Sequence, residues 1–291
     1  MADKVQELKD YAITKEPFYE PQGNEVEVFD VAWKNKIPVI LKGPTGCGKT
    51  RFLENRAYYY NNELAKASKK GEHRTLPFVT VSCHEDLTAH DLLGRYLMDG
   101  SWMDGPALTA VKHGGILYLD EIVEARKDTT VVIHPLSDHR RTISVDKLGK
   151  VYEADENFLL VMSYNPGYQS VHKNLKPSTK QRFVHIVFTY PKKEQEVMII
   201  MEESGLKDAK VAGALTDIAS KIRNLHEERK IEEGASTRSL IYAARLIKDG
   251  ISPRDACEVA LVNAIADGAQ AAGEIRSGIE DLVVSKFPQK R

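Results

Sequence analysis

Short apolar runs alternate with longer segments of helical periodicity along the first two thirds of the chain. The runs are rich in β-branched and aromatic residues and are bounded by turn residues, which is typical of strands. Five such runs occur: IPVILKG, FVTVSC, GILYLDEI, FLLVMSYNP and FVHIVFTY. Because strands that alternate with helices usually pair in parallel and are covered on both faces, the pattern predicts an α/β fold with a mostly parallel sheet.

The pattern changes after Tyr190, where the segments have helical instead of strand periodicity. Ser236 and Ser252 have the residue type that favours helix N-caps, and a proline follows the second of them at the first helical position. We therefore expect two domains, an α/β domain over residues 1–190 and a small all-helical domain over residues 191–291.

The composition limits the classes of function. The chain has 291 residues, 42% of them hydrophobic, which is enough for a sizeable core. Its formal net charge is -1, so no global basic field points to nucleic acid as a partner. Three widely spaced cysteines argue against a disulfide framework or a zinc site and favour a reducing, cytoplasmic setting. Neither a signal peptide nor a membrane span is expected, because no apolar stretch is long enough.

A glycine-rich loop directly follows the first predicted strand and fits the pattern G-x-x-x-x-G-K-[ST]. The residues expected to bind a nucleotide are Gly43, Pro44, Thr45, Gly46, Cys47, Gly48, Lys49 and Thr50. Glycines let successive N–H groups point at phosphates, next to the positive end of the following helix. Lys49 would reach the β- and γ-phosphates and the Thr50 hydroxyl would ligate Mg²⁺. Cys47 is interpreted as a tolerated small residue.

Polar side chains follow two further strands. Asp120 and Glu121 end a buried run, and such costly charge suggests that Asp120 holds Mg²⁺ while Glu121 polarises the attacking water. The alternative is a helix cap at the end of the strand. Asn165 also follows an apolar run, where its amide could contact the γ-phosphate or position the water. By itself, an Asn before a proline is ordinary turn chemistry.

Two arginines complete the candidate site. Arg182 comes just before the fifth predicted strand, and Arg238 lies at the start of a helix in the second domain. A guanidinium can stabilise the charge that develops on a transferring phosphoryl group. The alternative for each is a solvated surface arginine.

Four other functions are weighed against these motifs. A small-molecule kinase would not need the Asp-Glu pair beside an Asn or the helical domain with its arginine. A GTPase normally carries N-K-x-D, which this sequence lacks. A nucleic-acid motor is disfavoured by the balanced charge and by the lack of a basic tract with interleaved aromatics. A non-enzymatic interaction protein would not need the intact Asp120-Glu121 pair.

The five features, in this order, resemble an AAA+ ATPase with Walker A, Walker B, sensor 1, arginine finger and sensor 2 motifs. The segment LLGRYLMDGSWMDGPALTAVKHGGILYLDEI resembles the MoxR group, and RRTISVDKLGKVYEADENFLLVMSYNPGYQSVHKNLKPSTKQRF resembles its CbbQ/NorQ family. The similarity covers roughly residues 25–285, with the CbbQ side the more similar.

This resemblance implies ATP and Mg²⁺ as cofactors and a homo-oligomeric, usually hexameric ring with ATP bound between subunits. It implies that Arg182 acts on the neighbour's ATP and Arg238 on the ATP of its own subunit. Position 180 is Lys where relatives are expected to have Arg. The family also implies a partner with a von Willebrand factor A domain, similar to CbbO, and a client enzyme. Rubisco, freed of inhibitory sugar phosphates, is the expected client. The alternatives are nitric oxide reductase or another metalloenzyme that a MoxR-type chaperone matures.

Two insertions are candidates for protein contacts. Residues 94–105 are unusually apolar for a loop and either pack on the subunit itself or face another protein. The segment RRTISVDKLGKVYEADE is expected to form a hairpin, and the resemblance implies that its tip faces the ring pore. The loop that begins at His84 lacks a set of metal ligands at regular spacing and is interpreted as structural or client-facing.

Overall fold

The computed structural model describes residues 8, 10–67, 75–166, 175–266 and 272–288. The chain forms two compact units. The first, here the α/β unit, comprises residues 1–17, 23–43 and 49–188. The second, here the helical unit, comprises residues 18–22, 44–48 and 189–291. The helical unit thus includes two short segments from the first part of the chain, one of which is the tip of the glycine-rich loop. The two domains expected from the sequence, residues 1–190 and 191–291, remain a prediction.

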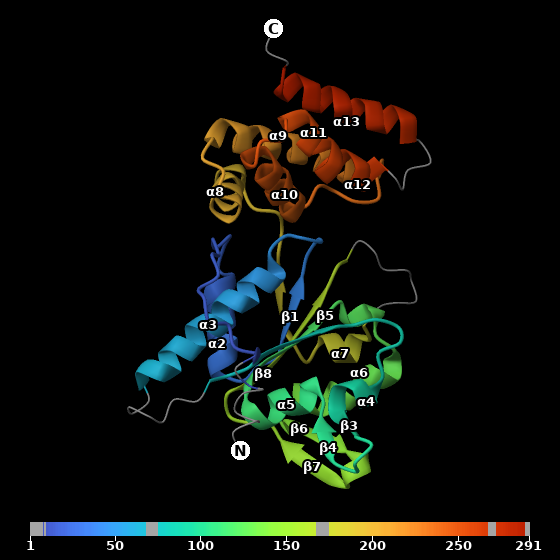
Figure 1. The fold of residues 1–291 in the computed structure, drawn as a ribbon. Coiled ribbons are helices and arrows are strands. Elements are labelled where there is room, and N and C mark those ends of the chain that lie inside the picture. Colours follow the sequence, from blue (N-terminus) through green and yellow to red (C-terminus); the bar gives the residue numbers. More distant parts are fainter. Residues whose placement is uncertain (1–7, 9, 68–74, 167–174, 267–271, 289–291) are drawn as a thin grey trace. The chain divides into compact units, whose positions relative to one another are not determined.

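A five-stranded sheet forms the centre of the α/β unit (Figure 1). Its strands are β1 (Val39–Lys42), β2 (Phe78–Ser82), β5 (Gly115–Asp120), β8 (Phe158–Tyr164) and β9 (Val184–Val187). Their order is β2-β5-β8-β1-β9, and all neighbours are parallel. Almost every residue of β5 and β8 is buried, as expected for central strands covered on both faces. The predicted α/β class and all five predicted strands are confirmed.

Helices lie on both sides of this sheet (Figure 1). They are α2 (Glu25–Lys34), α3 (Lys49–Ala67), α4 (Ala89–Leu93), α5 (Pro106–His113), α6 (Lys127–Ile133) and α7 (Pro177–Lys180). Short 3₁₀ turns follow β5, α6 and the later strand Thr142–Val145, at Ile122–Glu124, His134–Ser137 and Asp146–Leu148. Aromatic rings pack α2 and α3 together, with Phe29 and Phe52 centroids 5.1 Å apart. Phe52 also lies 5.4 Å from Phe188, so α3 is fixed beside the end of β9.

Two hairpins project from the α/β unit (Figure 1). The first pairs β3 (Gly94–Tyr96) with β4 (Trp102–Asp104), so the apolar insertion is a hairpin and not an irregular loop. Trp102 packs on the hydrophobic core, whereas Met98 at the turn is fully exposed. The second hairpin pairs β6 (Thr142–Val145) with β7 (Lys150–Glu153), which confirms the hairpin predicted for this segment.

The helical unit is built on a hydrophobic core of its own. Its helices are α8 (Lys193–Ser204), α9 (Ala209–Glu227), α10 (Thr237–Lys248), α11 (Pro253–Cys257), α12 (Asn263–Ala266) and α13 (Ala272–Lys286), with a π-helical turn at Glu258–Val262. The hydroxyls of Ser236 and Ser252 accept from the backbone N–H groups of Ser239 and Asp255, so both predicted N-caps are confirmed.

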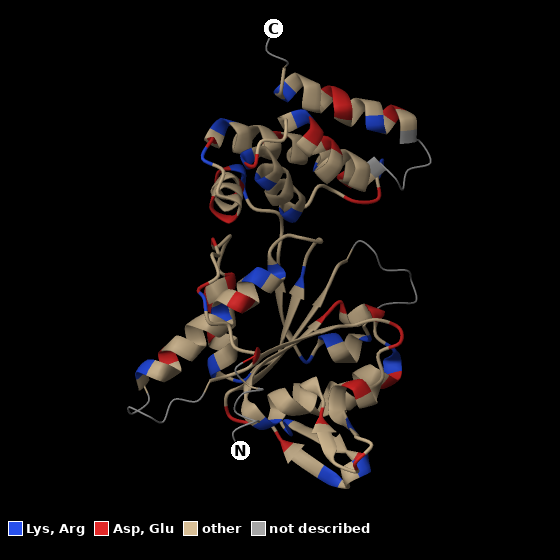
Figure 2. Cartoon of the chain, in the orientation of Figure 1, with Lys and Arg blue, Asp and Glu red and all other residues tan. Residues whose placement is uncertain are grey.

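Acidic and basic residues are interspersed along the helices of each unit, as the near-zero net charge suggests (Figure 2). Across the described ranges, no helix combines the length and the apolar character that a membrane crossing requires. Residues 167–174, which include the end of the SYNPGY segment, lie outside the described residues.

Candidate active site

The glycine-rich loop lies between β1 and α3, and each of its glycines has a steric reason. Gly46 and Gly48 have φ values of 68° and 102°, a region that side chains rarely adopt. A Cβ added to Gly43 would lie 2.5 Å from the Phe188 carbonyl oxygen, so only glycine fits there. The loop can therefore turn tightly at the N-terminal end of α3, where backbone N–H groups favour phosphate.

Lys49, Asn165 and Glu121 form one hydrogen-bonded chain across three elements. The Lys49 ammonium donates to the Gly43 carbonyl oxygen and to Asn165 Oδ1, both at 2.8 Å. The Asn165 amide nitrogen donates to Glu121 Oε1 at 3.1 Å. Because the ammonium can only donate and the carboxylate can only accept, these partners fix which way the amide of Asn165 points. Three predicted site residues, distant in sequence, are thus brought together.

Asp120 is held by two hydroxyl groups that are not among the predicted site residues. Tyr118 Oη donates to Asp120 Oδ1 at 2.6 Å, and Ser163 Oγ donates to the same oxygen at 2.5 Å. Ser163 also accepts from the Glu121 backbone N–H at 3.1 Å. The Thr50 hydroxyl is hydrogen-bonded to Tyr118 as well, so Tyr118 links the two residues predicted to hold Mg²⁺.

The sequence carried only weak signals for Tyr118 and Ser163. Tyr118 precedes Asp120 by two positions in a strand, so both side chains lie on the same face. Ser163 is the polar residue in an otherwise apolar strand segment, and it is fully buried. A buried hydroxyl needs a partner, and this requirement could have pointed to both positions.

Charge and burial act together on Glu121. Its partial burial raises the pKa of the carboxyl, and the neighbouring Asp120 raises it further, whereas Lys49 lowers it. Its backbone has a φ of 54°, which is uncommon for a non-glycine residue and often marks functional positions. Cys83 lies beside this pair, and burial together with Asp120 and Glu121 raises its pKa to about 12, which favours the protonated thiol over the thiolate.

The two predicted arginines lie in different surroundings. Arg182 contacts Asp138 Oδ2 and the His134 carbonyl oxygen, each at 3.3 Å, and not the Lys49–Asn165–Glu121 chain. Arg238 is exposed on the first turn of α10, and a Cβ added to Gly46 would lie 3.5 Å from its Cβ. The structure thus places Arg238 next to the loop tip. Lys180 lies 5.9 Å from the ring centroid of Tyr164.

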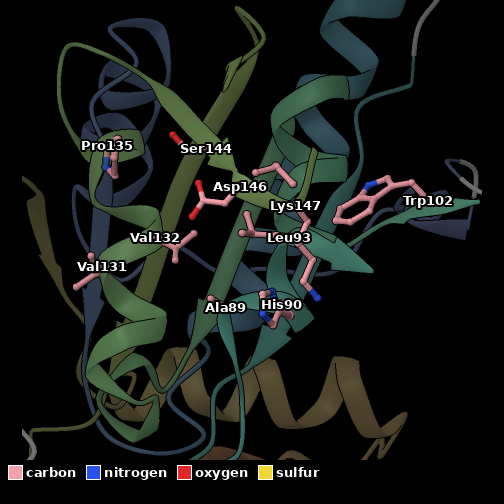
Figure 3. Close-up of a pocket in the computed structure, with 11 residues that line it drawn as sticks. Ala89, His90, Leu93, Trp102, Val131, Val132, Pro135, Ser144, Asp146 and Lys147 are labelled. Atoms are coloured by element: carbon pink, nitrogen blue, oxygen red, sulfur yellow. The ribbon is translucent and has the colours of Figure 1, made fainter. Parts of the chain in front are cut away.

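A separate cavity of about 250 Å³ lies between α4, α6 and the two hairpins (Figure 3). Its walls include Leu93, Trp102, Val132, Pro135 and Lys147, and none of the predicted site residues. The cavity is therefore distinct from the candidate nucleotide site.

Two family descriptions match the chain. Residues 38–183 match an AAA domain of the dynein-related subfamily, and residues 196–285 match the CbbQ/NirQ/NorQ C-terminal domain. The first match contains the loop and both strand-end groups, and the second contains Arg238. An AAA domain binds and hydrolyses ATP, so the chain is an ATPase.

Three curated relatives are similar over nearly their whole length. The denitrification regulatory protein NirQ of Pseudomonas aeruginosa is 51% identical, with 86% of this chain and 92% of the relative covered. Protein CbbQ of Hydrogenophilus thermoluteolus is 48% identical, covering 94% and 97%. Protein NorQ of Paracoccus denitrificans is 48% identical, covering 93% and 94%. The chain therefore belongs to the CbbQ/NirQ/NorQ family of MoxR-group AAA+ ATPases.

Proposed function

We propose that this protein is a cytoplasmic ring chaperone that uses ATP hydrolysis to remodel a client enzyme. The observation that supports the proposal most strongly is the chain from Lys49 through Asn165 to Glu121. It joins a cation suited to phosphate with a carboxylate suited to activating water, and the amide between them fixes their separation.

Each residue has a distinct task in hydrolysis. Lys49 neutralises charge on the β- and γ-phosphates, and the loop N–H groups hold the phosphate oxygens. Glu121 accepts a proton from the attacking water, to which its raised pKa is suited. Asn165 keeps Glu121 at the distance that this transfer needs.

Thr50 and Asp120 fit a magnesium ion. Their hydroxyl and carboxylate oxygens are the donor types that Mg²⁺ prefers, and Tyr118 bonds to both residues. When bound, the ion would supply neutralisation of the phosphate charge. Tyr118 and Ser163 keep the Asp120 carboxylate in one orientation before any ligand arrives.

Arg182 and Arg238 divide the stabilisation of the γ-phosphate. Arg182 is 37% exposed and lies on the α/β unit away from the Lys49 chain, which suits action on the ATP of a neighbouring subunit in a hexamer. Arg238, next to the loop tip, would act on the ATP of its own subunit. Hydrolysis would then depend on assembly, because a lone subunit lacks the neighbour's Arg182.

The ring would act on its client through a von Willebrand factor A partner. Rubisco that is blocked by tight-binding sugar phosphates is the first client to test. ATP cycling would have to favour the opened form of the client, since only differential binding can shift such an equilibrium. A nitric oxide reductase is the second candidate, because a relative of 51% identity is a denitrification regulatory protein.

The test incubates each inhibited or immature client with this protein, the partner and ATP. Recovery of carboxylation supports Rubisco as the client, and recovery of nitric oxide reduction supports the second candidate. The Glu121→Gln variant is the control, because it should bind ATP without turnover. Recovery of neither client above this control would contradict the proposed remodelling function.

A further inference from the structure

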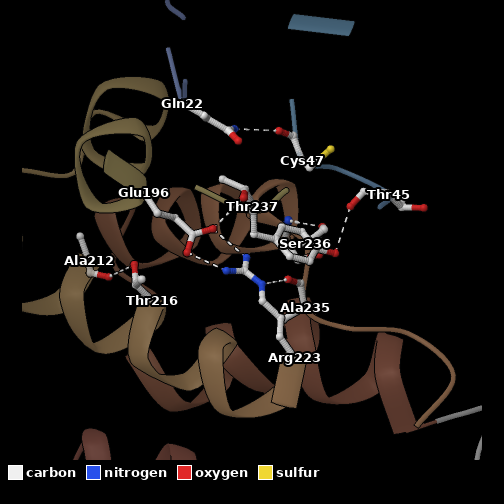
Figure 4. A network of polar contacts seen from close by, with 12 residues as sticks. Gln22, Thr45, Cys47, Glu196, Ala212, Thr216, Arg223, Ala235, Ser236 and Thr237 are labelled. Atoms are coloured by element: carbon white, nitrogen blue, oxygen red, sulfur yellow. Dashed lines mark hydrogen bonds and ion pairs between the residues drawn. The ribbon is translucent and has the colours of Figure 1, made fainter. Parts of the chain in front are cut away.

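Three successive residues at the tip of the phosphate-binding loop are contacted by residues from other segments of the helical unit. Tyr190 Oη donates to the Thr45 carbonyl oxygen at 3.3 Å. Gln22 Nε2 donates to the Cys47 carbonyl oxygen at 3.3 Å (Figure 4). Between them, Gly46 lies so close to Ser236 that an added Cβ would be 2.6 Å from the Ser236 Cβ.

These contacts bear on how the loop binds phosphate. The loop cradles anions with its N–H groups, whereas carbonyl oxygens that faced the same anions would repel them. A carbonyl that accepts a hydrogen bond from Tyr190 or Gln22 is directed at that donor. Because Tyr190 is largely buried, its pKa is raised to about 12, so it stays protonated and able to donate.

Tyr190 is itself held by a buried ion pair. The Arg223 guanidinium carbon lies 3.8 Å from the centroid of the Tyr190 ring. Arg223 donates twice to the Glu196 carboxylate, at 2.9 Å and 2.7 Å, and Glu196 is 0% exposed. Stacking on a guanidinium that cannot rotate freely leaves the Tyr190 hydroxyl in one place.

The same ion pair also fixes the start of α10 (Figure 4). Arg223 Nε donates to the Ala235 carbonyl oxygen at 2.8 Å, and the Thr237 hydroxyl donates to Glu196 Oε1 at 2.6 Å. These two contacts flank Ser236, the residue on which Gly46 rests. Arg238 is the next residue after Thr237, so its backbone position is set by this pair.

A buried ion pair contributes little net stability compared with apolar residues of the same size. Its presence here therefore needs another reason. The pair holds both the Tyr190 ring and the start of α10, and this double role supplies that reason. We propose that Tyr190 and the Arg223–Glu196 pair are positioning residues that keep the phosphate-binding loop and Arg238 in the arrangement that binds nucleotide. The inference rests on the proposed nucleotide-binding role of the loop.

The first test removes only the hydroxyl of Tyr190. Tyr190→Phe keeps the ring on Arg223 but loses the donor to Thr45, so the affinities for ATP and ADP should both fall about three- to tenfold, the value of one hydrogen bond. The measurement is a fluorescence titration of the full chain with labelled ATP and ADP. Thr216→Val is the matched control, since it removes a buried hydroxyl bond of 3.1 Å within α9 of the same unit and should leave both affinities unchanged.

The second test separates positioning from general stability. Thr237→Val removes one donor to Glu196 without leaving a charge unpaired. The substitution loosens the start of α10, where Arg238 lies. It should therefore weaken the binding of ATP more than that of ADP, and the ratio of the two affinities should change about threefold. In the double variant with Arg238→Ala, Thr237→Val should add no further change in that ratio. A purely structural role would lower the Tm and leave the ratio unchanged.

The results distinguish this inference from the proposed function. If Tyr190→Phe binds both nucleotides as tightly as Thr216→Val, or if Thr237→Val leaves the affinity ratio unchanged, the positioning role is wrong. Lys49→Ala tests the site itself. Normal ATP binding by Lys49→Ala would overturn the nucleotide site. If Lys49→Ala loses ATP binding but Tyr190→Phe binds both nucleotides normally, only the positioning role is overturned.

Discussion

Two polar clusters of this protein differ in how far their charges are satisfied. The strand-end cluster, Lys49, Asp120, Glu121 and Asn165, runs from buried to exposed positions. Lys49 and Asn165 are each 8% exposed, whereas Glu121 is open to solvent. The helix cluster comprises Glu196, Arg223 and Thr237. Glu196 is 0% exposed, and both of its carboxylate oxygens accept hydrogen bonds from the other two side chains.

The difference shows how similar chemistry serves two purposes. In the strand-end cluster, partial burial and the neighbouring Asp120 both raise the pKa of the Glu121 carboxyl. In the helix cluster, the positive charge of Arg223 balances the negative charge of Glu196, and hydrogen bonds satisfy the remaining polar atoms. The cluster is therefore rigid and leaves no group for a ligand. On the proposed function, the first cluster receives the nucleotide, whereas the second fixes the positions of neighbouring residues.

The largest expected effect tests whether the strand-end cluster needs an arginine from a neighbouring subunit in order to hydrolyse ATP. Arg182→Ala should keep ATP binding but lose about a thousandfold or more in hydrolysis, because an arginine finger contributes that much. Mixing it with a Lys49→Ala chain should restore turnover, since each subunit supplies what the other lacks.

Two variants control the mixing experiment. Arg140→Ala removes another arginine that pairs with Asp138, at 2.7 Å, and should have a small effect. Arg238→Ala should not be restored by mixing. If verified mixed rings show no recovery of Arg182→Ala, the action of Arg182 on a neighbouring subunit is wrong.

A second change tests the reactivity of Glu121 directly. Glu121→Gln should bind ATP normally and hydrolyse it at least about a hundredfold more slowly, because the amide cannot accept the proton from water. Steady-state turnover and equilibrium binding measured on the same sample separate the two effects. Full turnover would remove Glu121 from the mechanism.

The pH dependence of hydrolysis sharpens this test. A base must be deprotonated to act, so the rate should fall as the pH drops through the pKa of Glu121. Because that pKa is raised, the acid limb should lie at a higher pH than for an ordinary glutamate. The residual activity of Glu121→Gln should lack this limb.

A third change should affect stability in the helix cluster. Glu196→Gln leaves Arg223 buried without its counter-charge and should cost about 3–5 kcal/mol of unfolding free energy. Glu228→Gln is the matched control, because Glu228 forms an exposed pair with Lys230 and its loss should cost less than about 1 kcal/mol. Denaturant unfolding of both variants measures the difference, and equal costs would contradict the contrast between closed and exposed pairs.

The smallest effect is expected at Tyr118, which links Thr50 to Asp120. Tyr118→Phe should raise the Mg²⁺ concentration needed for half-maximal hydrolysis about tenfold, as for other groups that orient metal ligands. Nucleotide binding with Mg²⁺ removed by a chelator should be unchanged. Tyr60→Phe, which loses a bond of 2.6 Å to Asp30 on the same unit, is the control. An unchanged Mg²⁺ requirement would count against the orienting role.

Patterns along the chain were sufficient for much of the fold and for the core of the candidate site. The five strands could be predicted because runs such as FLLVMSY must be buried, and burial without alternation indicates a central parallel strand. The loop and the polar groups after the strands could be predicted because parallel strands end at one edge of the sheet, where such groups meet.

Contacts between distant segments could not be predicted in this way. The sequence determined which residues are candidates for the chemistry, because their types and spacing reflect local backbone geometry. Only the tertiary structure decided that Asn165 bridges Lys49 and Glu121, and that Tyr190 reaches Thr45 over a separation of 145 residues. Each of these bonds depends on an orientation set by packing between elements, and local periodicity contains no information on such orientations.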